Sequence, residues 1–139
     1  MNLNQTILAE LKQEAASTRN LLALVPFEKS DFKPHEKSMS LGRLARHVAE
    51  ISGWWKECLI LDELDFSKGD FTPKTLNSTE ELLDLHDRMV EQAEKILNET
   101  PESEFEKPWT MRNGEMIYFT IPQTHFVSTF EYKIFNRAN

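Results

Sequence analysis

Apolar residues recur every three or four positions in long stretches of the chain, the spacing that places them on one face of an α-helix. The first stretch covers about residues 4–24 and closes at Pro26, because proline cannot continue a helix. The second covers about residues 40–61, and Ser38 or Ser40 is suited to cap its free N–H groups. We therefore predict two amphipathic helices in the first half of the chain.

The second half predicts two more helices with a hairpin between them. Ser78 with Glu81 three residues later is typical of a capping box, and the helix that it opens is expected to end near Thr100. The segment "RNGE" carries the Asn-Gly pair of a tight turn, and "MIYFT" after it is typical of a short strand. A fourth helix is expected to begin at Pro122, since proline is favoured at the first helical position.

Four amphipathic segments in 139 residues predict an all-α protein, a four-helix bundle with a short hairpin before its last helix. This length suits a single domain over residues 1–139. The residues expected in the core are Leu44, Val48, Ile51, Leu82, Leu85, Met89, Val127 and Phe130.

Charge and composition narrow the class of partner. The chain has 23 acidic and 16 basic residues, a formal charge of −7 that disfavours binding to a nucleic-acid backbone. Its N-terminal segment has acidic residues and no long apolar run, so we expect neither a signal peptide nor a membrane anchor. The single cysteine, Cys58, has no partner for an internal disulfide, which favours a reducing compartment. A cytoplasmic location is the expectation.

Histidines are the first candidates for chemistry. His47 lies three residues after Leu44 and four before Ile51, so it is expected at the edge of an apolar helical stripe. An inward-facing imidazole there is a natural metal ligand, and the alternative is a flank histidine bonded to a neighbour. His86 either flanks the core or pairs with a carboxylate, and His35 is expected to be exposed in a loop.

Other reactive or aromatic residues have simpler interpretations. Trp54 and Trp55 are placed to line a pocket near His47, but aromatic residues at helical spacing usually pack in a core. Cys58 is a small hydrophobe without a compelling histidine partner for nucleophilic catalysis. The acidic runs at 62–65 and 80–81 are typical of solvated helix ends.

The segment "KPHEKSMSLGRLARHVAEISGWW" resembles the DinB family, which shares a Ser-x-x-x-Leu-x-x-His-Val/Leu-Ala pattern, here from Ser40 to Ala49. "DELDF" and "PWTMRNGEMIYFTIP" are similar to one branch of that family, and the similarity runs in order along nearly the whole chain. The resemblance implies a four-helix bundle of up-up-down-down type. It also implies a divalent metal held by three histidines, one of them His47 and two from the fourth helix.

The chain departs from this pattern in its last helix. Aligned on Arg137 and Ala138, Tyr132 and Asn136 occupy the two other ligand positions that the resemblance implies. A tyrosine ligates only as a phenolate, and a neutral amide is a poor ligand for zinc or nickel. His125 precedes Tyr132 by seven residues, about 10 Å along a helix, too far to replace either ligand. We therefore predict that the chain binds zinc or nickel weakly or not at all. His47 itself is still predicted to face the bundle interior, from its place beside Leu44 and Ile51 and from the family pattern.

Two hypotheses for function remain open. The resemblance implies a metal-dependent thiol transferase or hydrolase that acts on a small-molecule or thiol substrate, with its metal site impaired here. The alternative is a non-catalytic bundle that binds a small molecule or a protein, or the product of a truncated gene. The last helix is shorter here than the resemblance implies, and a shortened helix would leave apolar surface uncovered, which predicts a homodimer.

Overall fold

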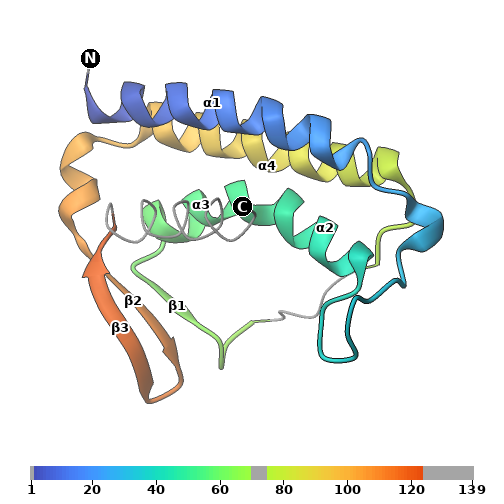
Figure 1. Ribbon diagram of the computed structural model, residues 1–139. Coiled ribbons are helices and arrows are strands. Elements are labelled where there is room, and N and C mark those ends of the chain that lie inside the picture. Colours follow the sequence, from blue (N-terminus) through green and yellow to red (C-terminus); the bar gives the residue numbers. More distant parts are fainter. Residues whose placement is uncertain (1, 70–74, 124–139) are drawn as a thin grey trace.

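A computed structural model describes residues 2–69 and 75–123 of the chain (Figure 1). The helices are α1 (Leu3–Leu22), α2 (Leu41–Glu50), α3 (Trp54–Leu59) and α4 (Thr79–Glu99). The strands are β1 (Glu63–Asp65), β2 (Pro108–Asn113) and β3 (Met116–Pro122). Short 3₁₀ turns cover Phe27–Lys29, Ile51–Gly53 and Glu102–Glu106.

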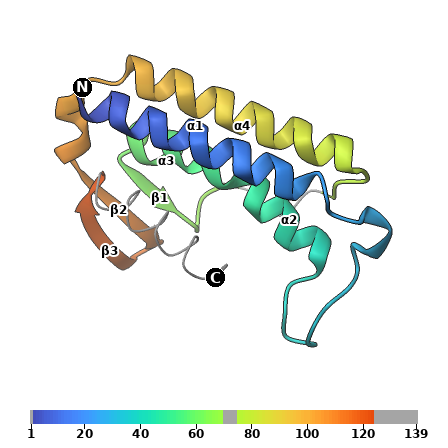
Figure 2. The same ribbon diagram turned by 45° about the horizontal axis from the view of Figure 1, so that its top comes forward.

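The long helices α1 and α4 lie side by side and run in opposite directions, with α2 and α3 packed against them (Figures 1 and 2). Helix α2 runs in the same direction as α4 and opposite to α1 (Figure 1). If α1 is taken as running up, α2 and α4 both run down. The up-up-down-down order implied by the resemblance is therefore wrong for these helices. None of the described helices combines the length and apolar character that a bilayer crossing requires.

Helix starts follow the local sequence signals. Ser40 caps α2, because its hydroxyl accepts a hydrogen bond from the backbone N–H of Arg43 at 3.3 Å. Ser78 caps α4 in the same way through the N–H of Glu81 at 3.1 Å. The predicted capping box is half formed, since the Glu81 carboxylate accepts from the N–H of Asn77 at 2.8 Å and not from that of Ser78.

The second predicted helix is broken in the middle. Helix α2 ends at Glu50, a 3₁₀ turn follows over Ile51–Gly53, and α3 begins at Trp54. The break lies against α4, where a Cβ built on Gly53 would come within 2.8 Å of the Met89 sulfur. A glycine therefore lets the chain pass close to α4 at the point where the helix tightens.

The prediction of an all-α protein is only partly correct. The described residues form a mostly helical fold with a small three-stranded sheet at one end. Strand β2 pairs in parallel with β1 and antiparallel with β3. The hairpin turn places Gly114 at a φ of +60°, as the Asn-Gly pair predicts. Pro122 ends β3 opposite Pro108 and Gln123 directly after it is helical, so the predicted fourth helix begins one residue later than expected. The predicted fourth helix otherwise falls outside the described residues.

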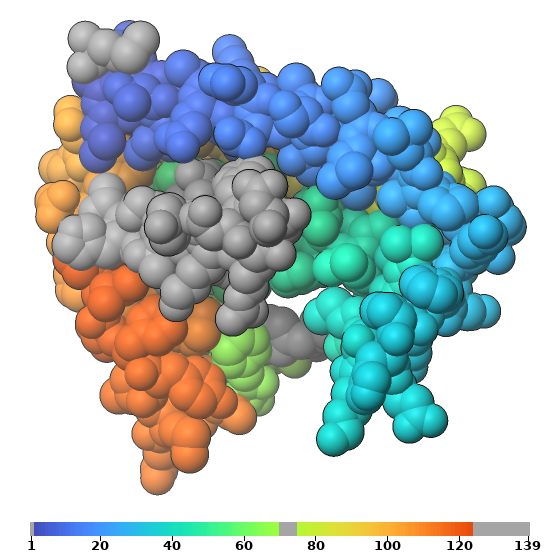
Figure 3. Space-filling model, in the orientation of Figure 1, coloured from blue at the N-terminus to red at the C-terminus, as the bar shows by residue number. Residues whose placement is uncertain are grey.

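The hairpin and the loop before α2 project from opposite ends of the helical body. Figure 3 shows the β2–β3 hairpin at one end and the segment around residues 31–40 at the other.

The carboxylate of Asp65 connects β1 to the turn of the hairpin. It accepts hydrogen bonds from the Ser67 hydroxyl at 2.7 Å, the Ser67 N–H at 2.9 Å and the Gly114 N–H at 2.9 Å. These bonds, the Ser67 hydroxyl first, lower the pKa of Asp65 from 3.8 to about 2.

We expect this carboxylate to stabilise the sheet over a defined pH range. A group whose pKa is lowered by folding contributes stability above its unfolded value, and that contribution is lost as the pH falls through about 2. A carbon-13 NMR titration of the Asp65 carboxyl should give a midpoint near 2, and Ser67→Ala should raise it. A midpoint near 3.8 in the unmodified chain would contradict the observed hydrogen bonds.

The buried residues form two clusters. The first joins α1, α3, α4 and the sheet, and contains Leu11, Trp55, Cys58, Leu59, Leu64, Ala93, Ile96, Leu97, Phe105 and Trp109. The second joins α1, α2 and α4, and contains Leu22, Ala45, Ala49, Leu82 and Leu85.

The expected core is only partly confirmed. Leu82 and Leu85 are buried as predicted, but Leu44 is wrong, because 48% of it is exposed. Of the other expected residues, Val48, Ile51 and Met89 are partly buried, and Val127 and Phe130 lie outside the described residues. Helix α2 instead buries Ala45 and Ala49, whose small side chains allow it to approach α4 closely.

Candidate functional site

His47 lies in the last turn of α2 and its side chain is exposed. It shares a helical face with Leu44 and Ile51, whereas Ala45 and Ala49 make the buried contacts of the helix. His47 is therefore not enclosed by the described helices, and its interior position stays a prediction, because the last helix beyond Gln123 falls outside the described residues. The predicted apolar stripe consisted of the larger side chains of α2, but the residues that pack against α4 are Ala45 and Ala49.

The donors that the family resemblance assigns to the position of His47 do not suit a tight metal site. Over residues 2–69 and 75–123, no group of three or more His, Cys, Asp or Glu side chains is arranged to hold a metal ion. Tyr132, Asn136 and His125 lie outside the described residues. One imidazole with a phenol and an amide is a poor set for zinc or nickel, which prefer several nitrogen or thiolate ligands. The metal role of His47 stays a prediction.

Cys58 and the neighbouring tryptophans belong to the core. Cys58 is fully buried, and Trp55 is 4% exposed. Burial, with a smaller effect from Glu57, raises the pKa of the Cys58 thiol far above neutrality. Trp54 is partly buried and packs against the same cluster. The thiol therefore stays protonated and is no nucleophile, and the interpretation of these residues as core is confirmed.

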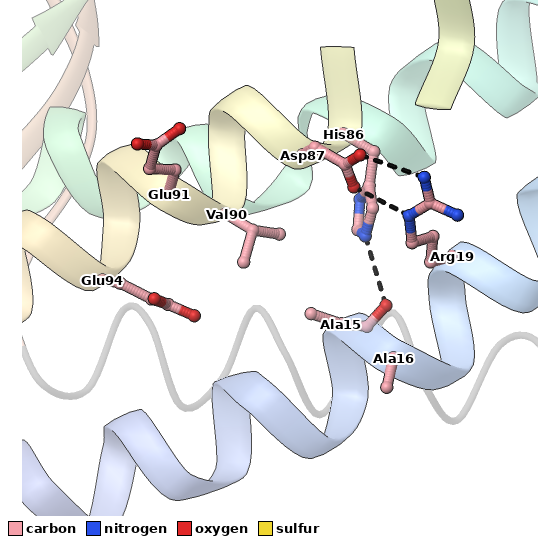
Figure 4. A pocket seen from close by; sticks show the side chains of 8 residues that line it. All are labelled: Ala15, Ala16, Arg19, His86, Asp87, Val90, Glu91 and Glu94. Atoms are coloured by element: carbon pink, nitrogen blue, oxygen red, sulfur yellow. Dashed lines mark hydrogen bonds and ion pairs between the residues drawn. The ribbon is translucent and has the colours of Figure 1, made fainter. Parts of the chain in front are cut away.

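His86 is buried between α1 and α4 (Figure 4). Its Nε2 lies 3.2 Å from the carbonyl oxygen of Ala15. Because a carbonyl can only accept, Nε2 carries the proton, and Nδ1 is buried without a hydrogen-bond partner in the described structure. Of the two alternatives for His86, the core position is correct, and its partner is a backbone carbonyl.

A shallow pocket of about 260 Å³ lies beside His86. At one end Arg19 and Asp87 form two parallel hydrogen bonds of 3.0 and 3.1 Å, with both side chains about half exposed, so this pair adds little stability. Glu91 and Glu94 lie toward the other end, away from the imidazole (Figure 4). These groups do not converge on one point, and the pocket is best understood as the seam between α1 and α4.

A second pocket, also of about 260 Å³, lies at the start of α2 and brings two arginines together. We call it the arginine pocket. The described residues that line it are Ser30, Asp31, Ser40, Gly42, Arg43, Arg46, Thr75 and Leu76. It joins the turn after Phe27–Lys29, the first turns of α2 and the segment before α4.

Arg43 and Arg46 were not predicted as site residues from the sequence, although both lie inside the segment that carries the family resemblance. The available signal was their spacing, since residues three apart lie on one helical face just after the capping Ser40. That signal is weak, because exposed arginines at this spacing are common. Only the fold shows that both side chains line one pocket.

Comparison with known proteins supports the resemblance seen in the α2 segment. None of the curated proteins is significantly similar to this chain. The family model described as "DinB family" matches residues 1–126, which include all the described helices and strands and the histidine of α2. The chain therefore belongs to the DinB family.

Proposed function

We propose that this chain is a DinB-family protein with an impaired metal position, and that it serves as a small-molecule-binding protein. The observation that carries the proposal is the donor set at the metal position. His47 supplies one imidazole, and Tyr132 and Asn136 stand where the family resemblance implies histidines. Such a set lacks the nitrogen-rich field that holds zinc or nickel tightly.

The described residues near α2 offer no substitute for the missing donors. A thiolate would be the strongest replacement ligand, but Cys58 is buried in the core and its pKa is raised. His86 is engaged with Ala15 in the seam between α1 and α4. These contacts argue against rebuilding the site from other helices, and therefore against a metal-dependent thiol transferase or hydrolase as the first choice.

Metal titration tests this proposal. Isothermal calorimetry of zinc and of nickel into protein purified without an affinity tag is expected to show weak binding or none. His47→Ala is the matched variant, and it should behave like the unmodified chain, because one exposed imidazole adds little affinity by itself.

Two results of the metal titration would overturn the proposal. Tight stoichiometric binding that is lost in His47→Ala would overturn the proposal and favour the metal-dependent enzyme. Tight binding that persists in His47→Ala would place a metal site elsewhere in the chain, and would also overturn it.

A further inference from the structure

The arginine pocket concentrates positive charge in an acidic protein. Among the described residues that line it, two are arginines and one is an aspartate, whereas the chain as a whole carries a formal charge of −7. The serine and threonine hydroxyls of Ser30, Ser40 and Thr75 complete a polar lining. A cavity of this kind attracts anions by charge and offers neutral donors beside it.

Arg46 supplies the most specific observation. Its side chain is 14% exposed, and its Nε and Nη2 both donate to one carboxylate oxygen of Glu50, at 3.0 and 2.8 Å. Its third nitrogen, Nη1, is buried and has no hydrogen-bond partner within the described chain. A buried charged donor without an acceptor is costly, so an acceptor at this position would be strongly favoured.

The backbone at the start of α2 does not compete for such an acceptor. The N–H groups of Leu41 and Gly42 donate to the carbonyls of Phe32 and Ser30, each at 2.9 Å. The N–H of Arg43 donates to the Ser40 hydroxyl. An anion in the pocket would therefore find no free N–H at these three positions, and the two guanidinium groups are the charged donors among the described lining residues.

The wall of the pocket is closely packed at Gly42. A Cβ built there would lie 3.0 Å from the Ser30 Cβ and 3.3 Å from its carbonyl oxygen. The absence of a side chain at position 42 lets the turn after Phe27–Lys29 touch α2 directly. This contact fixes the distance between the serine side of the pocket and the arginine side.

We propose that the arginine pocket binds the carboxylate group of a small organic molecule. A guanidinium presents planar paired donors that match a carboxylate; Arg43 offers such a pair, and Arg46, held by Glu50, adds its unpartnered Nη1. Asp31 on the lining and Glu50 beside Arg46 offset part of the positive charge, so the pocket suits a singly charged carboxylate better than a phosphate dianion. This inference rests on the proposed small-molecule-binding function but names a site distinct from the metal position.

Amide NMR titrations with sodium acetate and with inorganic phosphate, at constant ionic strength and with a metal chelator present, test the inference. Acetate should cause saturable shifts at Gly42 and Arg43, and phosphate should bind more weakly. Arg46→Gln should weaken acetate binding about tenfold, because a charge-assisted bond is lost. Arg43→Gln, a change at an exposed residue that spares the fold, should weaken it as well.

Arg88→Gln is the matched control, since Arg88 is an exposed arginine of α4 outside the pocket. It should leave the acetate shifts unchanged. Absence of saturable shifts, or equal weakening by Arg88→Gln, would overturn the site, and tighter binding of phosphate would overturn the carboxylate assignment. Tight metal binding in the calorimetric titration would remove the proposed function without altering the acetate result, so the two failures are distinguishable.

Discussion

Replacing Trp109 by alanine is expected to lower the free energy of unfolding by about 3–5 kcal/mol, the range for truncating a buried large aromatic residue. Trp109 is fully buried in the first core cluster and comes from β2. Its indole N–H also donates to the carbonyl oxygen of Glu57 at 2.9 Å, which joins the sheet to α3. The substitution removes both the packing and this bond, so urea unfolding followed by circular dichroism should show a large shift of the midpoint.

Two further variants separate these contributions. Trp109→Phe keeps most of the aromatic bulk but leaves the Glu57 carbonyl without its donor, so a loss of about 1–3 kcal/mol is expected. Tyr118→Ala removes a half-exposed aromatic residue from the neighbouring strand and should change stability by about 0.5 kcal/mol or less. Equal effects of Trp109→Ala and Tyr118→Ala would show that the sheet does not pack on α3 as described.

Helix ends and the hairpin turn could be predicted because their signals are local. Ser40 and Ser78 cap the helices that follow them, and the Asn-Gly pair puts Gly114 at positive φ. Each of these features depends on hydrogen bonds or backbone sterics within a few residues. Sequence reasoning that looks at neighbours is sufficient for them.

The orientation of α2 could not be predicted in the same way. The pattern favoured Leu44 as a core residue because it is large and apolar, yet the face that packs on α4 carries Ala45 and Ala49. Hydrophobicity alone ranks alanine low, but small residues permit the closest approach between helices. The position of His47 relative to α4 depends on this rotation, which the apolar pattern alone does not determine.

Contacts between segments that lie far apart in the chain could not be predicted from the sequence either. The amide of Asn4 donates to the carbonyl oxygens of Leu97 and Thr100, each at 2.7 Å, and so satisfies the end of α4 from the start of α1. The parallel pairing of β1 with β2 joins residues on either side of α4. The arginine pocket likewise joins the turn before α2 to the segment before α4. None of these pairs is marked by periodicity or by a local motif.

Restoring the donors at the family's metal position is expected to have the largest effect on binding. The double substitution Tyr132→His and Asn136→His should raise zinc or nickel affinity by orders of magnitude, since histidines four apart on a helix project from one face toward a third ligand. Calorimetric titration of the unmodified chain and the double variant measures the gain.

The gain should depend on His47 and on both new ligands. Adding His47→Ala to the double variant should remove most of the gained affinity, because only two imidazoles would remain. Tyr132→His alone should give an intermediate affinity, for the same reason. If the double variant binds no better than the unmodified chain, the last helix does not face His47 as the family resemblance implies. A gain that survives His47→Ala would instead mean that the new histidines bind metal without α2, and that His47 is not part of the family position in this protein.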